Sequence, residues 1–259
     1  MTVTSVAIAD LAARLDEAAV TGTPIPQLAA DHGIDVDTAY HVQQALVDRR
    51  LARGEHLVGA KMGLTSRAKM AQVGVEEPIL GQLTDTTVVP DGGTADIGGL
   101  IHPRVEPEIA FLLDRAPTPG TPFTDAVRAV APALEVIDSR YANFTFSLPD
   151  VIADNTSAAL FTVGAWRPVP DGVDNLGVLL EIDGRTVQTG STAAILGDPR
   201  RALAAGVALA GRHGPALRAG WIFLAGAATA AVPLAPGAQV RATVQGLGTA
   251  SFTTTGGAS

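Results

Sequence analysis

Apolar residues recur at helical spacing through the first 55 residues. One face of the first predicted helix carries Ala7, Leu11, Leu15 and Ala18, and the turn-forming residues Gly22, Pro24 and Pro26 follow it. A second helix is expected from about Asp37 to Arg53. Asp35 or Asp37 can cap its start, and Gly54 stands where a helix end favours a left-handed residue. The N-terminal region is therefore predicted to be helical.

Beyond Leu57 the pattern changes to short apolar runs separated by Gly, Pro and Asp, which is typical of strands. The expected strands are 57–61, 86–89, 106–113, 133–137, 178–182, 221–225 and 239–244. A helix is predicted over Pro199–His213, with Asp198 as its cap and Gly214 at its end. Because strands and helices do not alternate regularly, a doubly wound sheet or an eight-fold barrel fits poorly. We expect a mixed α+β fold around a twisted or rolled sheet.

Composition narrows the function classes. The chain has 259 residues, 47% hydrophobic and 17% charged, with a formal net charge of −8 and no Cys. The negative charge argues against nucleic-acid binding, and the missing Cys excludes disulfides, thiol catalysis and thiolate metal sites. No apolar run reaches the roughly 20 residues of a membrane helix, and the acidic N-terminal segment does not resemble a signal peptide. A soluble, cytoplasmic protein is expected.

Three glutamates are candidate metal ligands. In a strand, Glu106 and Glu108 share one face, with their Cα atoms about 7 Å apart. Glu135 lies in a second apolar run that ends at Asp138. Carboxylates without a neighbouring His or Cys favour Mg²⁺ or Mn²⁺ over zinc or copper. The alternative is a solvated strand face, which the spacing alone leaves equally open.

Lys61 ends another apolar run and is followed by Gly63, Thr65 and Ser66. This stretch mimics a phosphate-binding loop only superficially, because the Ser or Thr that should follow the lysine is Met62. A short helix is expected over 67–73, and its N-terminus together with Lys61 could hold a substrate carboxylate. An ordinary surface lysine is the plainer alternative. The segment 150–157 reads as a short helix or a turn.

Together these segments resemble the fumarylacetoacetate hydrolase superfamily, in its hydratase/decarboxylase branch from catechol meta-cleavage pathways of aromatic catabolism. The stretches that carry the resemblance are 59–66, 78–81, 103–111, 133–140, 148–150, 153–155 and 226–233. The resemblance implies a mixed β-roll catalytic domain over 57–259, after a small helical N-terminal region over 1–56. It also implies Mg²⁺ or Mn²⁺ on Glu106, Glu108 and Glu135, and no organic cofactor.

The resemblance further implies a small 2-oxo dicarboxylate as substrate. The metal would chelate its 1-carboxylate and 2-oxo oxygens, with Lys61 in the same pocket and backbone donors from the Leu64 region. Arg67 and Arg140 are the candidates for the distal carboxylate, since a guanidinium can bind it through two hydrogen bonds. The expected assembly is a homo-oligomer, with a sister hydratase as a candidate partner.

Two sister reactions of this branch compete. One removes CO₂ from 2-oxo-3-hexenedioate to give 2-hydroxypenta-2,4-dienoate, and the other hydrates that product. Both pass through a dienolate whose negative charge a metal stabilises. Ile79 stands where hydratases of the branch usually have Asp, a candidate acid/base, so decarboxylation is favoured. Trp221 and Ala225 replace polar residues expected around their strand, which bears on substrate identity. A non-catalytic assembly subunit is the third alternative.

Overall fold

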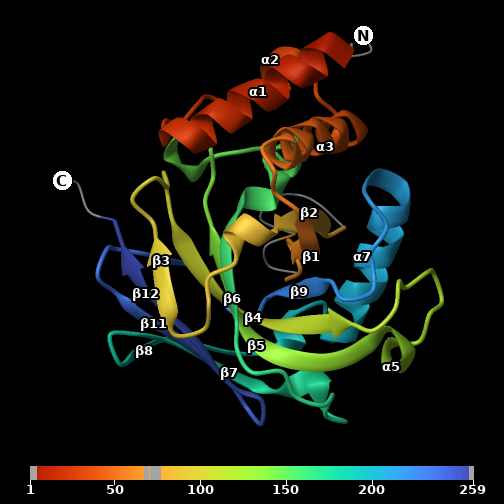
Figure 1. Ribbon diagram of the computed structural model, residues 1–259, viewed down its shortest axis with the longest axis vertical. Coiled ribbons are helices and arrows are strands. Elements are labelled where there is room, and N and C mark those ends of the chain that lie inside the picture. Colours follow the sequence, from red (N-terminus) through yellow and green to blue (C-terminus); the bar gives the residue numbers. More distant parts are fainter. Residues whose placement is uncertain (1–4, 67–69, 71–76, 257–259) are drawn as a thin grey trace.

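The computed structural model of the chain describes residues 5–66, 70 and 77–256. Three helices precede the first strand: α1 (Ser5–Thr21), α2 (Ala29–His32) and α3 (Val36–Ala52). They lie together on one side of the molecule (Figure 1). Asp35, not Asp37, caps α3, because its side chain accepts a 2.8 Å hydrogen bond from the Thr38 amide. The predicted helical N-terminal region is therefore present, and the first strand of the protein follows it at Leu57.

Two sheets form the body of the protein. The larger has the order β2 (Ile79–Thr84), β1 (Leu57–Gly63), β9 (Ile222–Ala227), β4 (Arg104–Leu113), β5 (Val127–Ile137) and β6 (Ala158–Val163), with β10 (Val232–Pro233) beside β4. The smaller has the order β3 (Gly93–Asp96), β12 (Gly248–Thr255), β11 (Gln239–Val244), β7 (Gly177–Ile182) and β8 (Arg185–Ser191). Both mix parallel and antiparallel pairs. The mixed α+β class is confirmed.

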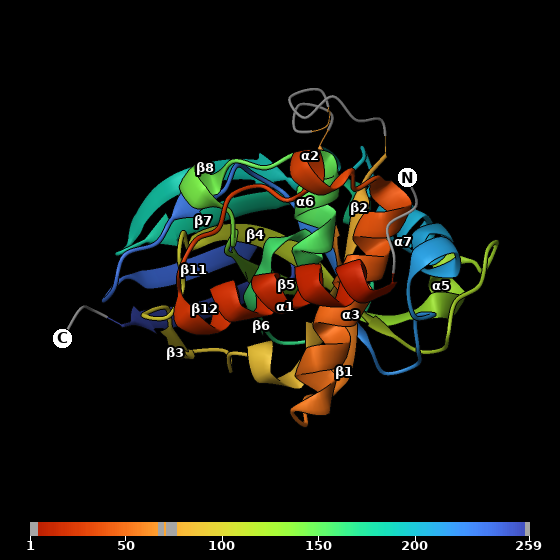
Figure 2. The ribbon, with the colours of Figure 1, turned by 90° about the horizontal axis from the view of Figure 1, so that it is seen from above.

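Shorter helices connect the strands: α5 (Phe123–Ala126), α6 (Leu148–Ala153) and α7 (Pro199–His213). The 3-10 turns are η1 (Asp85–Thr87), η2 (Ala142–Phe144), η3 (Asn155–Ser157), η4 (Val173–Asn175) and η5 (Thr192–Ala194). Helix α7 has the predicted bounds, and Asp198 accepts from the Arg200 amide as its cap. Viewed from above, α1 and α3 lie over the sheets (Figure 2).

Packing between the two sheets covers one face of the central strands β4 and β5. Val105, Leu134 and Val136 of β4 and β5 pack against Val240 and Phe252 of the smaller sheet. Neighbouring side chains of a strand point to opposite faces. Glu106, Glu108 and Glu135 therefore face away from this inter-sheet core, into the concave side of the larger sheet.

The structure differs from the sequence prediction in one strand and leaves other predictions untested. The segment 86–89 is not a strand: Asp85–Thr87 forms the 3-10 turn η1, in which Thr87 Oγ1 donates to the Thr84 carbonyl. Such local side-chain bonds offer the backbone an alternative to a strand ladder. The segment 150–157 divides into α6 and η3. Most of the helix expected over 67–73 lies outside the described residues, and the division into regions 1–56 and 57–259 stays a prediction. No described helix has the length and apolar character needed to cross a membrane.

Candidate metal centre

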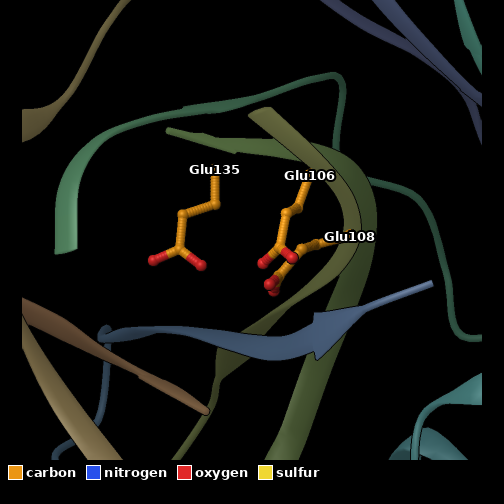
Figure 3. A group of neighbouring side chains, drawn as sticks. All are labelled: Glu106, Glu108 and Glu135. Carbon is orange, nitrogen blue, oxygen red and sulfur yellow. The ribbon is translucent and has the colours of Figure 1, made fainter. Parts of the chain in front are cut away.

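Three glutamates meet on the concave face of the larger sheet, and we call them the acidic triad: Glu106, Glu108 and Glu135. Strands β4 and β5 pair antiparallel with Glu106 directly opposite Glu135 and Glu108 opposite Ala133. The ladder is regular there, so Glu106 and Glu108 keep to one face. The three side chains point toward one another (Figure 3). Their exposed fractions are 5%, 1% and 1%, so the triad is not a solvated strand face.

The oxygen atoms of the triad fit a divalent cation. One carboxylate oxygen from each residue lies within 4.8 Å of the others. Glu108 Oε2 accepts a 2.9 Å hydrogen bond from the Gly226 amide, whereas Oε1 of Glu108 and Oε1 of Glu135 are buried without a hydrogen-bond partner among the described residues. Buried carboxylate oxygens of this kind are costly unless a cation neutralises them. An all-oxygen donor set is the type that Mg²⁺ and Mn²⁺ prefer.

The pKa values of the buried carboxyls also indicate a cation site. Burial raises the pKa of Glu108 well above its usual range, and the nearby carboxylate of Glu135 raises it further, with Lys61 acting against both. Burial also raises the pKa of Glu135, and Lys61 again acts in the opposite direction. A bound cation would reverse this balance by favouring the ionised carboxylates.

Lys61 brings a positive charge next to the triad. It lies on β1, is 2% exposed, and its Nζ is 3.0 Å from Glu135 Oε2. The same Nζ donates a 3.0 Å hydrogen bond to the Thr156 carbonyl. The curl of the larger sheet makes this contact possible, because β9 and β4 separate β1 from β5 in the strand order. Lys61 is therefore a buried, hydrogen-bonded partner of the triad and not an ordinary surface lysine.

The turn η3 supplies a functional feature that the sequence interpretation missed. Asn155, Thr156 and Ser157 all have left-handed backbones, with φ of 47°, 55° and 57°. Consecutive non-glycine residues in this conformation are strained and need support from their surroundings. Asn155 gives that support by pairing its side-chain amide with the Gln82 backbone, at 2.8 and 2.9 Å. The Asp-Asn-Thr-Ser composition was a signal for a turn, but not for its contact with Lys61.

The backbone of Gly226 also contacts the triad, through its hydrogen bond to Glu108. Its φ is +112°, and a Cβ added there would come within 2.2 Å of Thr65 Oγ1. Only glycine combines this backbone with such a close approach. The amide that donates to Glu108 is thus held in place by the packing of Thr65 against Gly226.

A Gly226→Ala variant is expected to move the Glu108 carboxylate. Strain and the clash with Thr65 should lower the free energy of unfolding by about 1–3 kcal/mol. Mg²⁺ affinity should fall by about tenfold or more, because outer contacts orient metal ligands. Thermal unfolding and calorimetric Mg²⁺ titration measure the two effects. Gly214→Ala is the matched control, since nothing lies within 4 Å of a Cβ there. Unchanged Mg²⁺ binding in the Gly226 variant would contradict this role.

The remaining predicted site residues lie around this centre with different surroundings. Leu64 has a left-handed backbone (φ 55°) at the end of β1, next to Thr65. Ile79 is 3% exposed and pairs with Gly63. It lines a cavity of about 460 Å³ together with Tyr40 and His213. Arg67 lies outside the described residues.

Arg140 has a structural environment. Its Nε and its backbone amide both donate to the Asp154 carboxylate, and its Nη1 donates to the Ala158 carbonyl at 3.3 Å. The pair is buried, and burial raises the pKa of Asp154 to about 6 although Arg140 acts in the opposite direction. The structure therefore places Arg140 in a buried ion pair, and its predicted contact with a substrate carboxylate receives no support.

Comparisons with known proteins agree with this geometry. The model of the fumarylacetoacetate (FAA) hydrolase C-terminal family matches residues 49–254. A 4-oxalocrotonate decarboxylase from a Pseudomonas species is 54% identical over 96% of this chain and 98% of its own. A 2-keto-4-pentenoate hydratase from Burkholderia vietnamiensis is 38% identical over 96% and 97%.

Solved structures include a near match to the fold. The 4-oxalocrotonate decarboxylase from Pseudomonas putida G7, complexed with magnesium and adipate, superimposes with a TM-score of 0.93 at 40% identity, covering 98% of this chain and 99% of that one. The predicted fold type, a mixed β-roll core with a small helical N-terminal part, is confirmed by this match.

Proposed function

The chain belongs to the fumarylacetoacetate hydrolase family, and on this premise we propose that it decarboxylates 2-oxo-3-hexenedioate (4-oxalocrotonate) to 2-hydroxypenta-2,4-dienoate. The observation that carries the proposal is the buried acidic triad, in which one carboxylate oxygen of each glutamate lies within 4.8 Å of the others and Oε1 of Glu108 and of Glu135 has no hydrogen-bond partner among the described residues. The name of the relative with 54% identity supports the choice of reaction. The chain would then be a carbon–carbon lyase.

The roles of the residues follow from their positions. Glu106, Glu108 and Glu135 would hold Mg²⁺ or Mn²⁺. Bound there, the cation would supply a Lewis acid for the 1-carboxylate and 2-oxo oxygens of the substrate. Lys61 would add a second positive charge near the 2-oxo oxygen, where negative charge develops as the C5–C6 bond breaks and CO₂ leaves. The electron pair of that bond is delocalised through the alkene to this oxygen, so the reaction needs no organic cofactor.

The second candidate is the hydratase reaction on 2-hydroxypenta-2,4-dienoate. Relatives with hydratase names keep it in consideration. The buried Ile79 speaks against it, because an apolar side chain there cannot move protons to and from water. A non-catalytic assembly subunit is the least supported, since such a subunit has no need for a buried cluster of acids.

Product analysis separates these alternatives. The protein with Mg²⁺ receives 2-oxo-3-hexenedioate in one tube and 2-hydroxypenta-2,4-dienoate in another, and both are followed by NMR. A decarboxylase forms the dienoate in the first tube and leaves it unhydrated in the second. Formation of 4-hydroxy-2-oxopentanoate in the second tube would favour the hydratase instead. Inertness toward both would favour the assembly subunit.

The raised pKa of Glu108 gives a pH prediction. In the metal-free folded protein this carboxyl keeps its proton above the ordinary value of 4.5, whereas the unfolded chain loses it. The free energy of unfolding of the metal-free protein should therefore decrease as pH rises above 4.5. Mg²⁺ must displace the proton, so its affinity should increase with pH. Calorimetry at about pH 6 and about pH 8, in two buffers of different ionisation enthalpy, measures affinity and proton release. Equal affinity at both pH values without proton release would contradict the prediction.

We also propose that the chain works in the cytoplasm as a homo-oligomer, with a sister hydratase as a candidate partner. The reaction supports this pairing, because the dienoate that decarboxylation produces is the compound that a hydratase consumes. Co-purification with such a hydratase, followed by light scattering, tests the partnership.

A further inference from the structure

The concave face of β4 is apolar on one side of the triad and polar on the other. From the Glu108 position, the face continues toward Ala110, where Ala110, Ala133 and Leu224 belong to one buried apolar cluster. Phe161 of the same cluster pairs with Glu135 across β5 and β6. The interior is therefore filled by apolar side chains beyond Glu108. The charged far end of a ligand held by the triad is therefore better accommodated in the opposite direction along β4, away from this apolar cluster.

In that direction the next residue on the same face is Arg104. The ladder from Arg104 to Leu112 is unbroken, so Arg104, Glu106 and Glu108 alternate on one side of β4. Two residues of strand advance about 7 Å, which is comparable to the length of an extended six-carbon diacid. Arg104 pairs with Ile137 on β5 and with Pro233 on β10, so it lies at the end of the row formed by Arg104, Glu106 and Glu108, next to the short strand β10.

The Arg104 guanidinium is oriented but has no acidic partner. Its Cζ lies 4.1 Å from the centre of the Phe144 ring, a cation–π contact. Among the described residues, its guanidinium has no ion pair or hydrogen bond. Stacking fixes the plane of a guanidinium and leaves its N–H edge available for a carboxylate. Arg140, in contrast, donates hydrogen bonds from its guanidinium to Asp154.

His102 borders the same aromatic ring. Its ring meets Phe144 edge to face, with centroids 6.1 Å apart, and its Nε2 is buried without a hydrogen-bond partner among the described residues. Two nitrogen-bearing side chains with unused donor capacity thus flank Phe144 at one end of the triad row. A buried polar atom of this kind normally has a partner, and a carboxylate can accept from both residues.

We propose that Arg104, assisted by His102, binds the distal carboxylate of a dicarboxylate whose other end is held at the triad. The inference rests on the proposed function for the identity of the diacid, and it makes Arg104 the residue that selects dicarboxylates over monocarboxylates. The distal carboxylate is the group that leaves as CO₂, so its charge and its contact with Arg104 weaken in the transition state. Arg104 therefore contributes to substrate binding and not to the chemical step.

Adipate and hexanoate, six-carbon acids with two carboxylates and one, are the probes. The Mg²⁺-loaded wild-type protein should bind adipate more tightly than hexanoate. Arg104→Gln should reduce adipate affinity by about tenfold or more and leave hexanoate affinity unchanged. Arg104→Lys should recover part of the loss. With 2-oxo-3-hexenedioate, Arg104→Gln should raise KM and leave kcat unchanged or higher. Arg218→Gln is the matched control, since Arg218 also stacks on an aromatic ring, Trp221, away from the triad.

The outcomes separate this inference from the proposed function. If the wild-type protein prefers adipate and Arg104→Gln removes the preference, the inference holds even where no decarboxylation is found. If decarboxylation is found but Arg104→Gln keeps the wild-type adipate affinity and KM, the inference is wrong and the proposed function stands. A wild-type protein that binds Mg²⁺ without preferring adipate, or a variant that loses only kcat, overturns the inference. Circular dichroism verifies that each variant is folded.

Discussion

Replacing Glu108 with Gln is expected to lower turnover by more than 100-fold with the fold intact. Changing a partner that only orients a metal ligand costs roughly 10–100-fold, and loss of a ligand itself should cost more. Gln keeps the shape of the side chain and can still accept from the Gly226 amide. It also replaces a carboxyl whose ionisation is disfavoured by burial and by Glu135 with a neutral amide, so the metal-free protein should unfold at the same temperature or higher.

Initial rates with Mg²⁺, calorimetric Mg²⁺ titration and thermal unfolding measure these effects. Glu106→Gln and Glu135→Gln should lower turnover in the same way, because all three carboxylates contribute to one cluster. Glu181→Gln on β7 is the matched control, with the same chemical change on the smaller sheet. A Glu108 variant with the wild-type rate would show that the triad does not hold the catalytic metal.

Replacing Lys61 with Met is expected to have the second large effect, a loss of turnover of about 10²–10⁴-fold, the range of a positioned acid–base or charged group. Lys61 lowers the pKa values of both Glu108 and Glu135, so its loss should raise both further. Near neutral pH, more Glu108 would then be protonated in the metal-free protein.

Metal binding and catalysis should respond differently to this change. At high pH, where the carboxyls are ionised, Mg²⁺ affinity should equal or exceed that of the wild type, because a nearby cation has been removed. Turnover should stay low at every pH. Rate–pH profiles and Mg²⁺ titrations at two pH values test this pair of outcomes. Lys61→Arg retains the charge and should keep a larger part of the activity. If Lys61→Met instead reached the full wild-type rate at high pH, the role of Lys61 would be limited to lowering the pKa values of the triad carboxyls.

Local signals explain why parts of the fold could be predicted. The bounds of α7 follow from residues at its own ends, Asp198, Pro199 and Gly214, and the structure confirms them. Strand alternation likewise placed Glu106 and Glu108 on one face. The segment 86–89 has strand-like composition, but it forms a turn in which the Thr87 hydroxyl donates to the Thr84 carbonyl and the Val88 amide donates to the Asp85 carbonyl.

Contacts between distant residues could not be predicted in the same way. Glu135 meets Glu106 because of the β4–β5 register, and Lys61 meets Glu135 because the larger sheet curls. The ion pair of Arg140 with Asp154, 14 residues away, could not be predicted either, and a contact of Arg140 with the substrate stays a prediction. Arg104 was passed over because the contact that singles it out is with Phe144, 40 residues further along the chain. Composition and periodicity carry no information on such pairings.

The most direct test of the central claim is Mg²⁺-dependent release of CO₂ from 2-oxo-3-hexenedioate. The wild-type protein is measured with Mg²⁺, after treatment with a chelator, and after Mg²⁺ is restored, with the Glu108→Gln variant alongside. The proposed function predicts release with Mg²⁺, none with chelator, recovery on restoration, and almost none from the variant. Release that persists in the chelator, or that the variant matches, would contradict a decarboxylase built on the acidic triad.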